Sequence, residues 1–243
     1  MYQNYIFDLY GTLVDIETNE EKNSLWKKTA RLFALKGAIY MPSELKKRYK
    51  ELVCEKEELL AEKGKLPREA VEIKLEEVFE TLFLEKGIVP CQSEVLDMGL
   101  FFRNESITYI RLFPGTEALL KRLKKAGKKI WLLSNAQRIF TEPEMRMLGI
   151  YDYFDGILYS SDVGVKKPSS LFFDALMQRY NLRKEESVMT GNDCIADVVG
   201  AHEVGIASRY VHTRQSTPFT KALPLDCRRI TAIGEVYPDM QFK

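Results

Sequence analysis

Side chains that could carry out chemistry follow four short apolar segments of this 243-residue chain. The first segment, YIF at 5–7, is followed at once by Asp8, and the second, WLL at 131–133, leads directly into Ser134. Together the four segment ends supply carboxylates, a hydroxyl, an amide and lysines. In chain order these residues are Asp8, Gly11, Thr12, Ser134, Asn135, Lys166, Lys167, Asn192, Asp193 and Asp197.

Two of these carboxylates, Asp8 and Asp193, suit Mg²⁺, which prefers oxygen ligands and keeps several waters or substrate phosphate oxygens. A carboxylate with one free oxygen could also attack an electrophile. Toward a phosphate, such a nucleophile needs nearby positive charge because the two anions repel, and Lys167 with Mg²⁺ could supply it. The residue types therefore favour metal-assisted phosphoryl transfer through a covalent intermediate, which water then hydrolyses.

Each of these residues alone has a simpler interpretation. Asp8, with Gly11 and Thr12 a few residues later, could form an ordinary turn, and Ser134 could cap a helix. Asp193 or Asp197 could also be a helix cap, and Lys167 alone resembles a surface lysine. The chemical interpretation depends on finding all of them at the same end of successive strands.

Strands and helices alternate from about residue 111 onward, after a first strand at 5–7. Short apolar runs separated by amphipathic helices indicate βαβ units and a parallel sheet covered on both faces. In such a sheet the side chains that act on ligands gather beyond the carboxyl ends of the strands. The predicted strands are 128–135, 154–162, 186–193 and 206–212, and the predicted helices are 116–127, 169–180 and 195–205.

Residues 15–110 have a different character from the rest of the chain. Three segments, 17–37, 43–64 and 68–87, show helical spacing with abundant Lys and Glu and a glycine at the end. We expect a helical insertion seated on the α/β unit. The prediction is a core at 1–14 and 111–243 with a helical cap domain at 15–110.

Charge and composition exclude several classes of function. The 36 Lys and Arg residues nearly balance 35 Asp and Glu residues, so no overall basic field favours nucleic acid or a membrane surface as the partner. No apolar stretch is long enough to span a membrane, and we expect a cytoplasmic protein. Four scattered cysteines and two histidines give no zinc pattern.

The motifs around these residues resemble those of the haloacid dehalogenase superfamily of hydrolases. FDLYGTLVD (7–15) resembles the first motif of the family, LLSNA (132–136) the second and GVKKPSSLFF (164–173) the third. TGNDCIADVVGAHEVGI (190–206) resembles the fourth, and LFPGTEALLKRLKKAG (112–127) the segment that re-enters the core after the cap. The resemblance implies a Rossmann-like core with a mobile helical cap.

The resemblance also implies roles for individual residues. Asp8 matches the nucleophile, Ser134 the hydroxyl that binds the transferred phosphoryl group, and Lys167 the cation that steadies both. Asp193 matches a direct Mg²⁺ ligand, and Asp197 an acid that supports the metal or the lysine. The implied substrate-binding residues are Gly11, Thr12, Ser134, Asn135 and Lys167, and the implied metal site uses Asp8, the backbone carbonyl of Tyr10, Asp193 and Asp197.

Tyr10 departs from the phosphatase pattern, which usually has an aspartate two residues after the nucleophile as acid and base. A phenol, with a pKa near about 10, can donate a proton but is a poor base for water. The D-x-Y-G-T form instead resembles the metal-free L-2-haloacid dehalogenases. That branch has no evident use for Asp193 and Asp197, and no cap arginine among Arg31, Arg48 and Arg103 stands out as a halide ligand.

The favoured function is therefore a Mg²⁺-dependent phosphatase of a small phosphorylated metabolite, a phosphate ester or acyl phosphate. Acyl and aryl phosphates would best tolerate a missing acid, because their leaving groups are stable anions. Metal-free dehalogenation and a catalytically weak binding or regulatory protein are the alternatives. We expect a monomer or homodimer.

Overall fold

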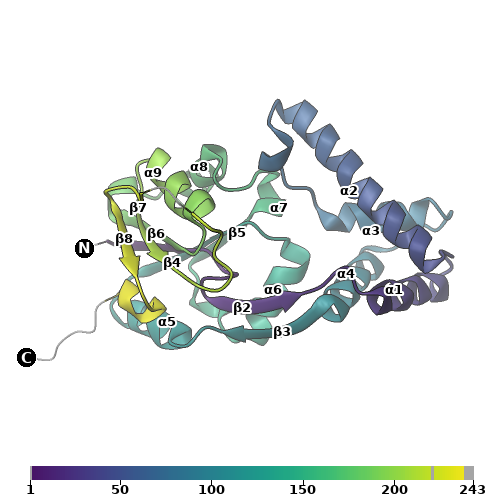
Figure 1. Ribbon diagram of the computed structural model, residues 1–243, viewed down its shortest axis with the longest axis horizontal. Helices are drawn as coiled ribbons and strands as arrows, with labels where there is room; N and C mark the ends of the chain where they lie inside the picture. Colours follow the sequence, from purple (N-terminus) through teal and green to yellow (C-terminus); the bar gives the residue numbers. More distant parts are fainter. Residues whose placement is uncertain (1, 220–221, 238–243) are drawn as a thin grey trace, which may run out of the picture.

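Six parallel strands form the central sheet of the computed structural model, which describes residues 2–219 and 222–237. Their order across the sheet is β5-β4-β1-β6-β7-β8 (Figure 1). The predicted α/β fold with a parallel sheet is confirmed. The strands are β1 Asn4–Phe7, β4 Lys129–Ser134, β5 Gly156–Tyr159, β6 Ser187–Gly191, β7 Ala207–Val211 and β8 Cys227–Ile230.

Helices cover both faces of this sheet. On one face, α5 (Thr116–Lys125) and α6 (Arg138–Met147) pack against a cluster that contains Tyr5 and Phe7 of β1. On the other face, α8 (Ser170–Arg179) and α9 (Gly200–Glu203) pack against a cluster that contains Ile6. Successive side chains of a strand point to opposite faces, so β1 contributes to both clusters and is buried throughout.

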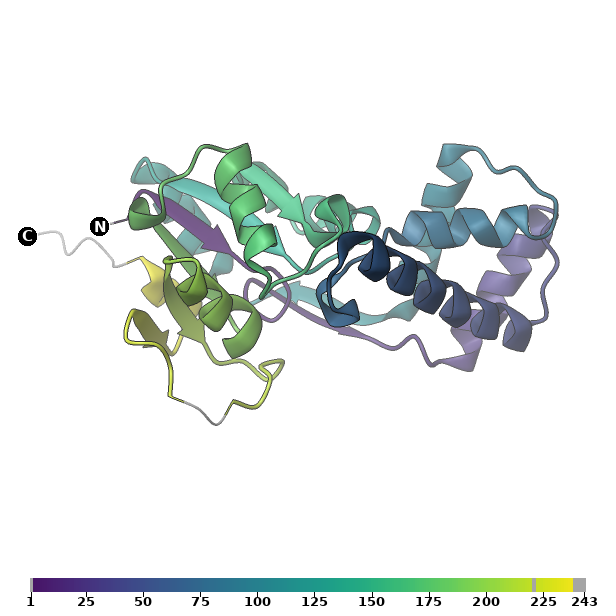
Figure 2. The ribbon, with the colours of Figure 1, turned by 90° about the horizontal axis from the view of Figure 1, so that it is seen from above.

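Between residues 23 and 106, four helices form a second body beside the sheet, which we call the helical lobe (Figure 2). They are α1 Asn23–Leu35, α2 Pro42–Gly64, α3 Leu75–Leu84 and α4 Gln92–Ser106, with a short 3₁₀ turn η1 at Arg68–Ala70. The Trp26 ring lies 5.4 Å from the Tyr49 ring and 5.3 Å from the Phe102 ring. Among the described residues, no helix is long and apolar enough to cross a membrane.

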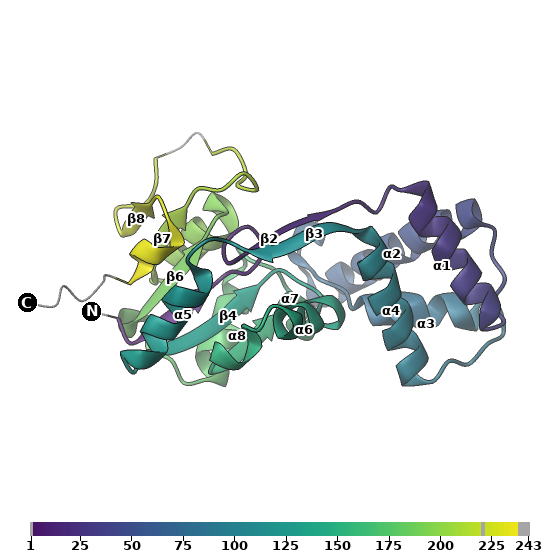
Figure 3. The ribbon, with the colours of Figure 1, turned by 90° about the horizontal axis from the view of Figure 1, so that it is seen from below.

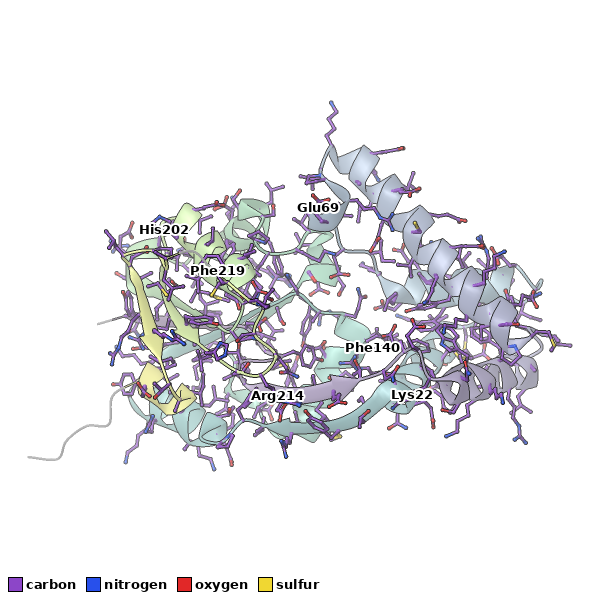
Figure 4. The ribbon with its side chains drawn as sticks, in the orientation of Figure 1. Lys22, Glu69, Phe140, His202, Arg214 and Phe219 are labelled. Carbon is purple, nitrogen blue, oxygen red and sulfur yellow. The ribbon has the colours of Figure 1, made fainter. Side chains whose placement is uncertain are left out.

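The helical lobe rests on helix α6 of the core. Ile139 and Phe140 of α6 belong to the same buried cluster as Trp26, Tyr49 and Phe102 of the lobe. Figure 4 places Phe140 between the two parts. The domain limits predicted above stay a prediction, and residues 1, 220–221 and 238–243 of the predicted core lie outside the described residues.

Two antiparallel strands, β2 (Val14–Thr18) and β3 (Ile107–Leu112), connect the helical lobe to the sheet (Figure 3). The predicted limits of the insertion fall at or inside this pair of strands. The buried carboxylate of Asp15 accepts hydrogen bonds from Arg111 (Nε, 3.0 Å) and from Arg214 (Nη2, 2.8 Å), which follows β7. The two segments that join the helical lobe to the core, β2 and β3, are therefore bound to each other and to the core.

Several elements differ from the prediction. Residues 160–163 form the short helix α7 (Ser160–Val163) rather than the end of a strand, and the predicted helix 195–205 begins with a π-helical turn, η4 (Cys194–Val199). Helix α4 and strands β2 and β3 were not predicted. Helix α6 was also missed because Pro143 lies inside it, and β8 because it is short and carries exposed arginines. The remaining short 3₁₀ turns are η2 Tyr151–Tyr153, η3 Lys184–Glu186 and η5 Ile233–Val236.

Candidate active site

Asp8 lies at the centre of the carboxyl edge of the sheet. Strand β1 pairs with β4 on one side and β6 on the other, so the ends of these strands meet around it. Asp8 is 8% exposed and forms part of the wall of a cavity of about 210 Å³. The other lining residues are Tyr10, Ser134, Asn135, Lys167, Asn192, Asp193, Ala196, Asp197 and Gln215.

The buried ammonium group of Lys167 joins two carboxylates. Its Nζ donates to Asp8 Oδ1 (2.9 Å), to Asp197 Oδ1 (2.7 Å) and to the carbonyl of Leu133 (2.7 Å). Burial alone would lower the pKa of Lys167, but the charges of Asp197 and Asp8 outweigh it and raise the pKa. The lysine is therefore a fixed positive charge next to Asp8.

The two oxygens of Asp8 are engaged unequally. Oδ1 accepts from Lys167 and from the hydroxyl of Ser134 (3.1 Å). Within residues 2–219 and 222–237, the one hydrogen-bond partner of Oδ2 is the hydroxyl of Thr12, at 3.3 Å. Because Oδ1 is held in place and neutralised, Oδ2 is the oxygen that is available for attack on an electrophile.

Asn135 holds the backbone of Lys167 in place. Its Nδ2 donates to the carbonyl of Lys167 (3.0 Å), and its Oδ1 accepts from the amide N–H of the same residue (2.8 Å). This pair of hydrogen bonds links the loop after β4 to the segment that carries the lysine. The predicted contact of Asn135 with substrate stays a prediction, but its side-chain amide does fix the backbone of Lys167.

Asp197 is fixed behind Lys167 by contacts on both of its oxygens. Oδ1 binds the ammonium group, and Oδ2 accepts from the amide N–H of Asp193 (3.0 Å). Burial, and the nearby charge of Asp8, raise the pKa of Asp197, while Lys167 opposes the shift. A Cβ on Gly191 would lie 2.0 Å from Asp197 Oδ2, so only glycine leaves room for this carboxylate.

Asp193 caps the helical turn that follows β6. Its Oδ1 accepts from the amide N–H groups of Ile195 (2.8 Å) and Ala196 (2.7 Å), and its Oδ2 accepts from the hydroxyl of Thr217. Both oxygens of this predicted metal ligand thus have partners. Its ligand role, like that of Asp197, stays a prediction that these contacts do not favour.

Asn192 is linked to Asp8 through the hydroxyl of Thr12. Asn192 Oδ1 lies 3.1 Å from the Thr12 hydroxyl, which also contacts Asp8 Oδ2. A Cβ on Gly11 would lie only 2.5 Å from the Asn192 amide, and Gly11 has a φ of +81°, so glycine is needed there on both grounds. The sequence signal for Asn192 was its position directly after β6. The sequence prediction instead chose its neighbour Asp193, because a carboxylate is the more common metal ligand.

The donor set near Asp8 fits one hard cation such as Mg²⁺. Asp8 Oδ2 and Asn192 Oδ1 meet at the same hydroxyl, and Mg²⁺ needs few protein oxygens when water and phosphate complete its shell. Within residues 2–219 and 222–237, no group of three or more His, Cys, Asp or Glu residues could hold a metal ion. A metal bound here would draw on oxygens other than carboxylates as well, such as the Asn192 amide, the backbone carbonyl of Tyr10 and the substrate phosphate.

The hydroxyl of Tyr10 is directed away from Asp8. It donates to Glu144 Oε2 (2.5 Å) and lies 3.1 Å from the hydroxyl of Thr141, and both of these residues belong to helix α6. Glu144 is also bound by Arg103 of the helical lobe, through a 2.6 Å contact between Nε and Oε1. Burial and the charge of Glu144 strongly raise the pKa of Tyr10, so the phenol is a poor proton donor to anything else.

Comparisons with known proteins agree with the motif resemblance. A family model described as haloacid dehalogenase-like hydrolase matches residues 2–205. A glyceraldehyde 3-phosphate phosphatase of Methanothermobacter thermautotrophicus is 28% identical over 218 residues, which cover 88% of this chain and 87% of the relative.

Two solved structures share the fold at low sequence identity. A 2-haloacid dehalogenase of Pseudomonas syringae has a TM-score of 0.65 at 17% identity and covers 97% and 96% of the two chains. A HAD phosphatase of Thermococcus onnurineus has a TM-score of 0.57 at 19% identity and covers 96% and 95%. The same fold thus carries both of the chemistries left open by the sequence.

Replacing Lys167 with Met should lower the free energy of unfolding by about 3–5 kcal/mol, because two buried carboxylates lose their shared positive charge. Urea denaturation measures the change. The matched control is Lys166→Met, where the half-buried neighbour has no contact with Asp8 and should change stability by less than about 1 kcal/mol. Equal losses in the two variants would contradict this assignment.

Substitutions of Asp193 separate a helix cap from a metal ligand. Asparagine caps a helix as well as aspartate, so Asp193→Asn should keep the stability of the wild type, whereas Asp193→Ala should lose about 1 kcal/mol. If the cap is the main role, Asp193→Asn also keeps any Mg²⁺-dependent turnover. Loss of turnover in a stable Asp193→Asn variant would instead establish it as a ligand.

Proposed function

Because the chain belongs to the haloacid dehalogenase-like hydrolases, we propose that it is a Mg²⁺-assisted phosphatase of small phosphorylated metabolites. The observation that carries the proposal is the unequal engagement of the two Asp8 oxygens. Lys167 and Ser134 hold Oδ1, while Thr12 is the one partner of Oδ2 in the part of the chain that the structure describes. The phosphatase name of a relative that spans most of both chains supports the choice of substrate.

The first half-reaction is attack of Asp8 Oδ2 on the phosphorus atom. A bond forms between Oδ2 and phosphorus while the bond from phosphorus to the leaving oxygen breaks, and the electron pair goes with that oxygen. Lys167 offsets the repulsion between the two anions, and Ser134 keeps the carboxylate aligned for in-line attack. Water then attacks the phosphorus atom. The bond between phosphorus and Oδ2 breaks and returns its electron pair to the Asp8 carboxylate, and one proton of the water passes to the solvent or to the released phosphate.

Asp8, Asn192 and the backbone carbonyl of Tyr10 would hold the Mg²⁺ ion. When bound, the ion would neutralise the oxygens of the phosphoryl group and help to orient them. An amide in place of a second carboxylate gives the site less negative charge, so we expect it to bind the ion weakly without substrate.

Tyr10 limits the substrates that such a site turns over quickly. Its hydroxyl is held by Glu144, which is paired in turn with Arg103, so no proton donor is positioned at residue 10 for the leaving group. Phosphates with stable leaving anions, such as acyl and aryl phosphates, should therefore react fastest. Alkyl phosphates should bind but turn over slowly.

The activity is tested by assays of p-nitrophenyl phosphate with and without Mg²⁺, and of 2-chloropropionate, with wild type and Asp8→Asn. We expect Mg²⁺-dependent phosphate release that falls by several orders of magnitude in the variant, because the nucleophile is gone. Chloride release without metal would favour the dehalogenase alternative. A protein that binds Mg²⁺ and turns over neither substrate would favour the binding or regulatory alternative.

The role of Tyr10 is tested by comparing p-nitrophenyl phosphate with glycerol 3-phosphate. Tyr10→Asp should raise alkyl phosphate turnover by roughly 10²–10⁴-fold, the usual contribution of a general acid, with little effect on the aryl substrate. Tyr10→Phe is the matched control, and should leave the ratio of the two rates unchanged. A selective loss of alkyl turnover in Tyr10→Phe would show that the phenol does donate the proton.

A further inference from the structure

The segment after β7, residues 213–217, lies against the turn that follows β1. The hydroxyl of Thr213 donates to the carbonyl of Gly11 in that turn (2.9 Å). At the other end of the segment, the hydroxyl of Thr217 donates to Asp193, which follows β6. This segment, which we call the β7 loop, is therefore bound to two of the turns that form the active site.

Gln215, in the middle of the β7 loop, lines the same cavity as Asp8. Its Nε2 donates to the backbone carbonyl of Ile16 in strand β2. A carbonyl can only accept a hydrogen bond, so this contact fixes the orientation of the side-chain amide. The other polar atom of the amide, Oε1, is buried and has no hydrogen-bond partner within residues 2–219 and 222–237. Gln215 therefore offers the cavity an acceptor that the fold itself does not use.

This oxygen differs from the other side-chain oxygens that line the cavity, each of which takes part in at least one hydrogen bond. Those others belong to Asp8, Tyr10, Ser134, Asn135, Asn192, Asp193 and Asp197. A buried acceptor without a partner is costly, and in folded proteins a bound water commonly supplies the missing donor. The cavity of about 210 Å³ has room for water beside a phosphoryl group, because one water molecule occupies about 30 Å³ in the liquid.

The second half-reaction needs an acceptor of this kind. The attacking water must be held with a lone pair toward phosphorus, and the hydroxyl of Tyr10 is not placed to hold it because it is bound to Glu144. A glutamine carbonyl that accepts a hydrogen bond from water can orient that water for attack on phosphorus. The same carbonyl cannot assist the first half-reaction, because a leaving oxygen needs a proton donor.

We propose that Gln215 orients the water that hydrolyses phosphorylated Asp8. Its Oε1 accepts a hydrogen bond from this water, whose oxygen bonds to phosphorus while the bond from phosphorus to Asp8 Oδ2 breaks and its electron pair returns to the carboxylate. The amide stays neutral throughout, and one proton of the water passes to the released phosphate or to the solvent. This inference rests on the proposed phosphatase function and adds a residue to its second step.

The test isolates the second half-reaction. Protein at saturating Mg²⁺ is mixed with saturating, radiolabelled p-nitrophenyl phosphate, and acid quenching during turnover gives the fraction of protein that carries phosphate. The turnover number divided by this fraction is the rate constant for hydrolysis of the intermediate, whichever half-reaction limits turnover. Gln215→Leu should lower this rate constant roughly tenfold, because a hydrogen bond to the water is lost. It should leave kcat/KM, which reports the phosphorylation of Asp8, within about twofold of the wild type.

Gln215→Glu is the matched control, because it also loses the donor to Ile16 but keeps an oxygen acceptor. It should keep the rate constant for hydrolysis of the intermediate within about threefold of the wild type. Ser216→Ala is a second control in the same loop, where the hydroxyl accepts from the amide N–H of Thr213 and does not line the cavity. This change should alter neither half-reaction.

Several outcomes would overturn this inference. They are an unchanged rate constant for hydrolysis in Gln215→Leu, an equal fall in Gln215→Glu or Ser216→Ala, an equal effect of Gln215→Leu on both half-reactions, and a change only in the Mg²⁺ concentration required. Absence of phosphorylated protein in the wild type, or its persistence in Asp8→Asn, would instead overturn the proposed function on which the inference rests.

Discussion

The ammonium group of Lys167, buried between Asp8 and Asp197, is the charge on which the rest of the active site depends. A lysine removed from water is stable only with paired negative charge, and here two carboxylates and a backbone carbonyl surround it. The same arrangement requires the segments after β1, β4 and β6 and the loop before α8 to meet at one point. The fold and the chemistry are thus connected, because the sheet order that brings these strand ends together also supplies the partners of the buried lysine.

The burial of Lys167 also gives the nearby acidic residues different roles. Asp197 balances the charge of the lysine and Asp193 caps a helical turn. Asp8 keeps one oxygen, Oδ2, whose single hydrogen-bond partner among the described residues is the Thr12 hydroxyl. Tyr10 couples this site to the helical lobe, since its hydroxyl binds Glu144 and Glu144 binds Arg103 of α4. Movement of the lobe relative to the core would change the contact between Arg103 and Glu144. The environment of the nucleophile therefore includes a residue 95 positions away in the chain, on an element that the sequence did not predict as a separate helix.

Much of this arrangement is readable from the sequence, because strands of a parallel sheet are short apolar runs and their carboxyl ends share one edge. That reasoning placed Asp8, Ser134 and Lys167 together, and both Ser134 and Lys167 do contact Asp8. It could not distinguish Asn192 from Asp193, since neighbouring residues after a strand point in different directions and only the backbone path decides which faces the nucleophile. The partners of Tyr10 also could not be predicted. The contact between Tyr10 and Glu144 joins distant segments, and Pro143 hid the helical pattern of the segment that carries Glu144.

The most direct test of the account is to trap the covalent intermediate on Asp8. Wild-type protein is mixed with p-nitrophenyl phosphate and Mg²⁺, quenched during turnover, treated with borohydride and analysed by peptide mass spectrometry. Borohydride reduces an acyl phosphate to an alcohol but leaves a free carboxylate intact, so the account predicts reduction at Asp8 that requires substrate. An unmodified Asp8 under conditions of rapid turnover, or a phosphoryl group on Ser134, would contradict it.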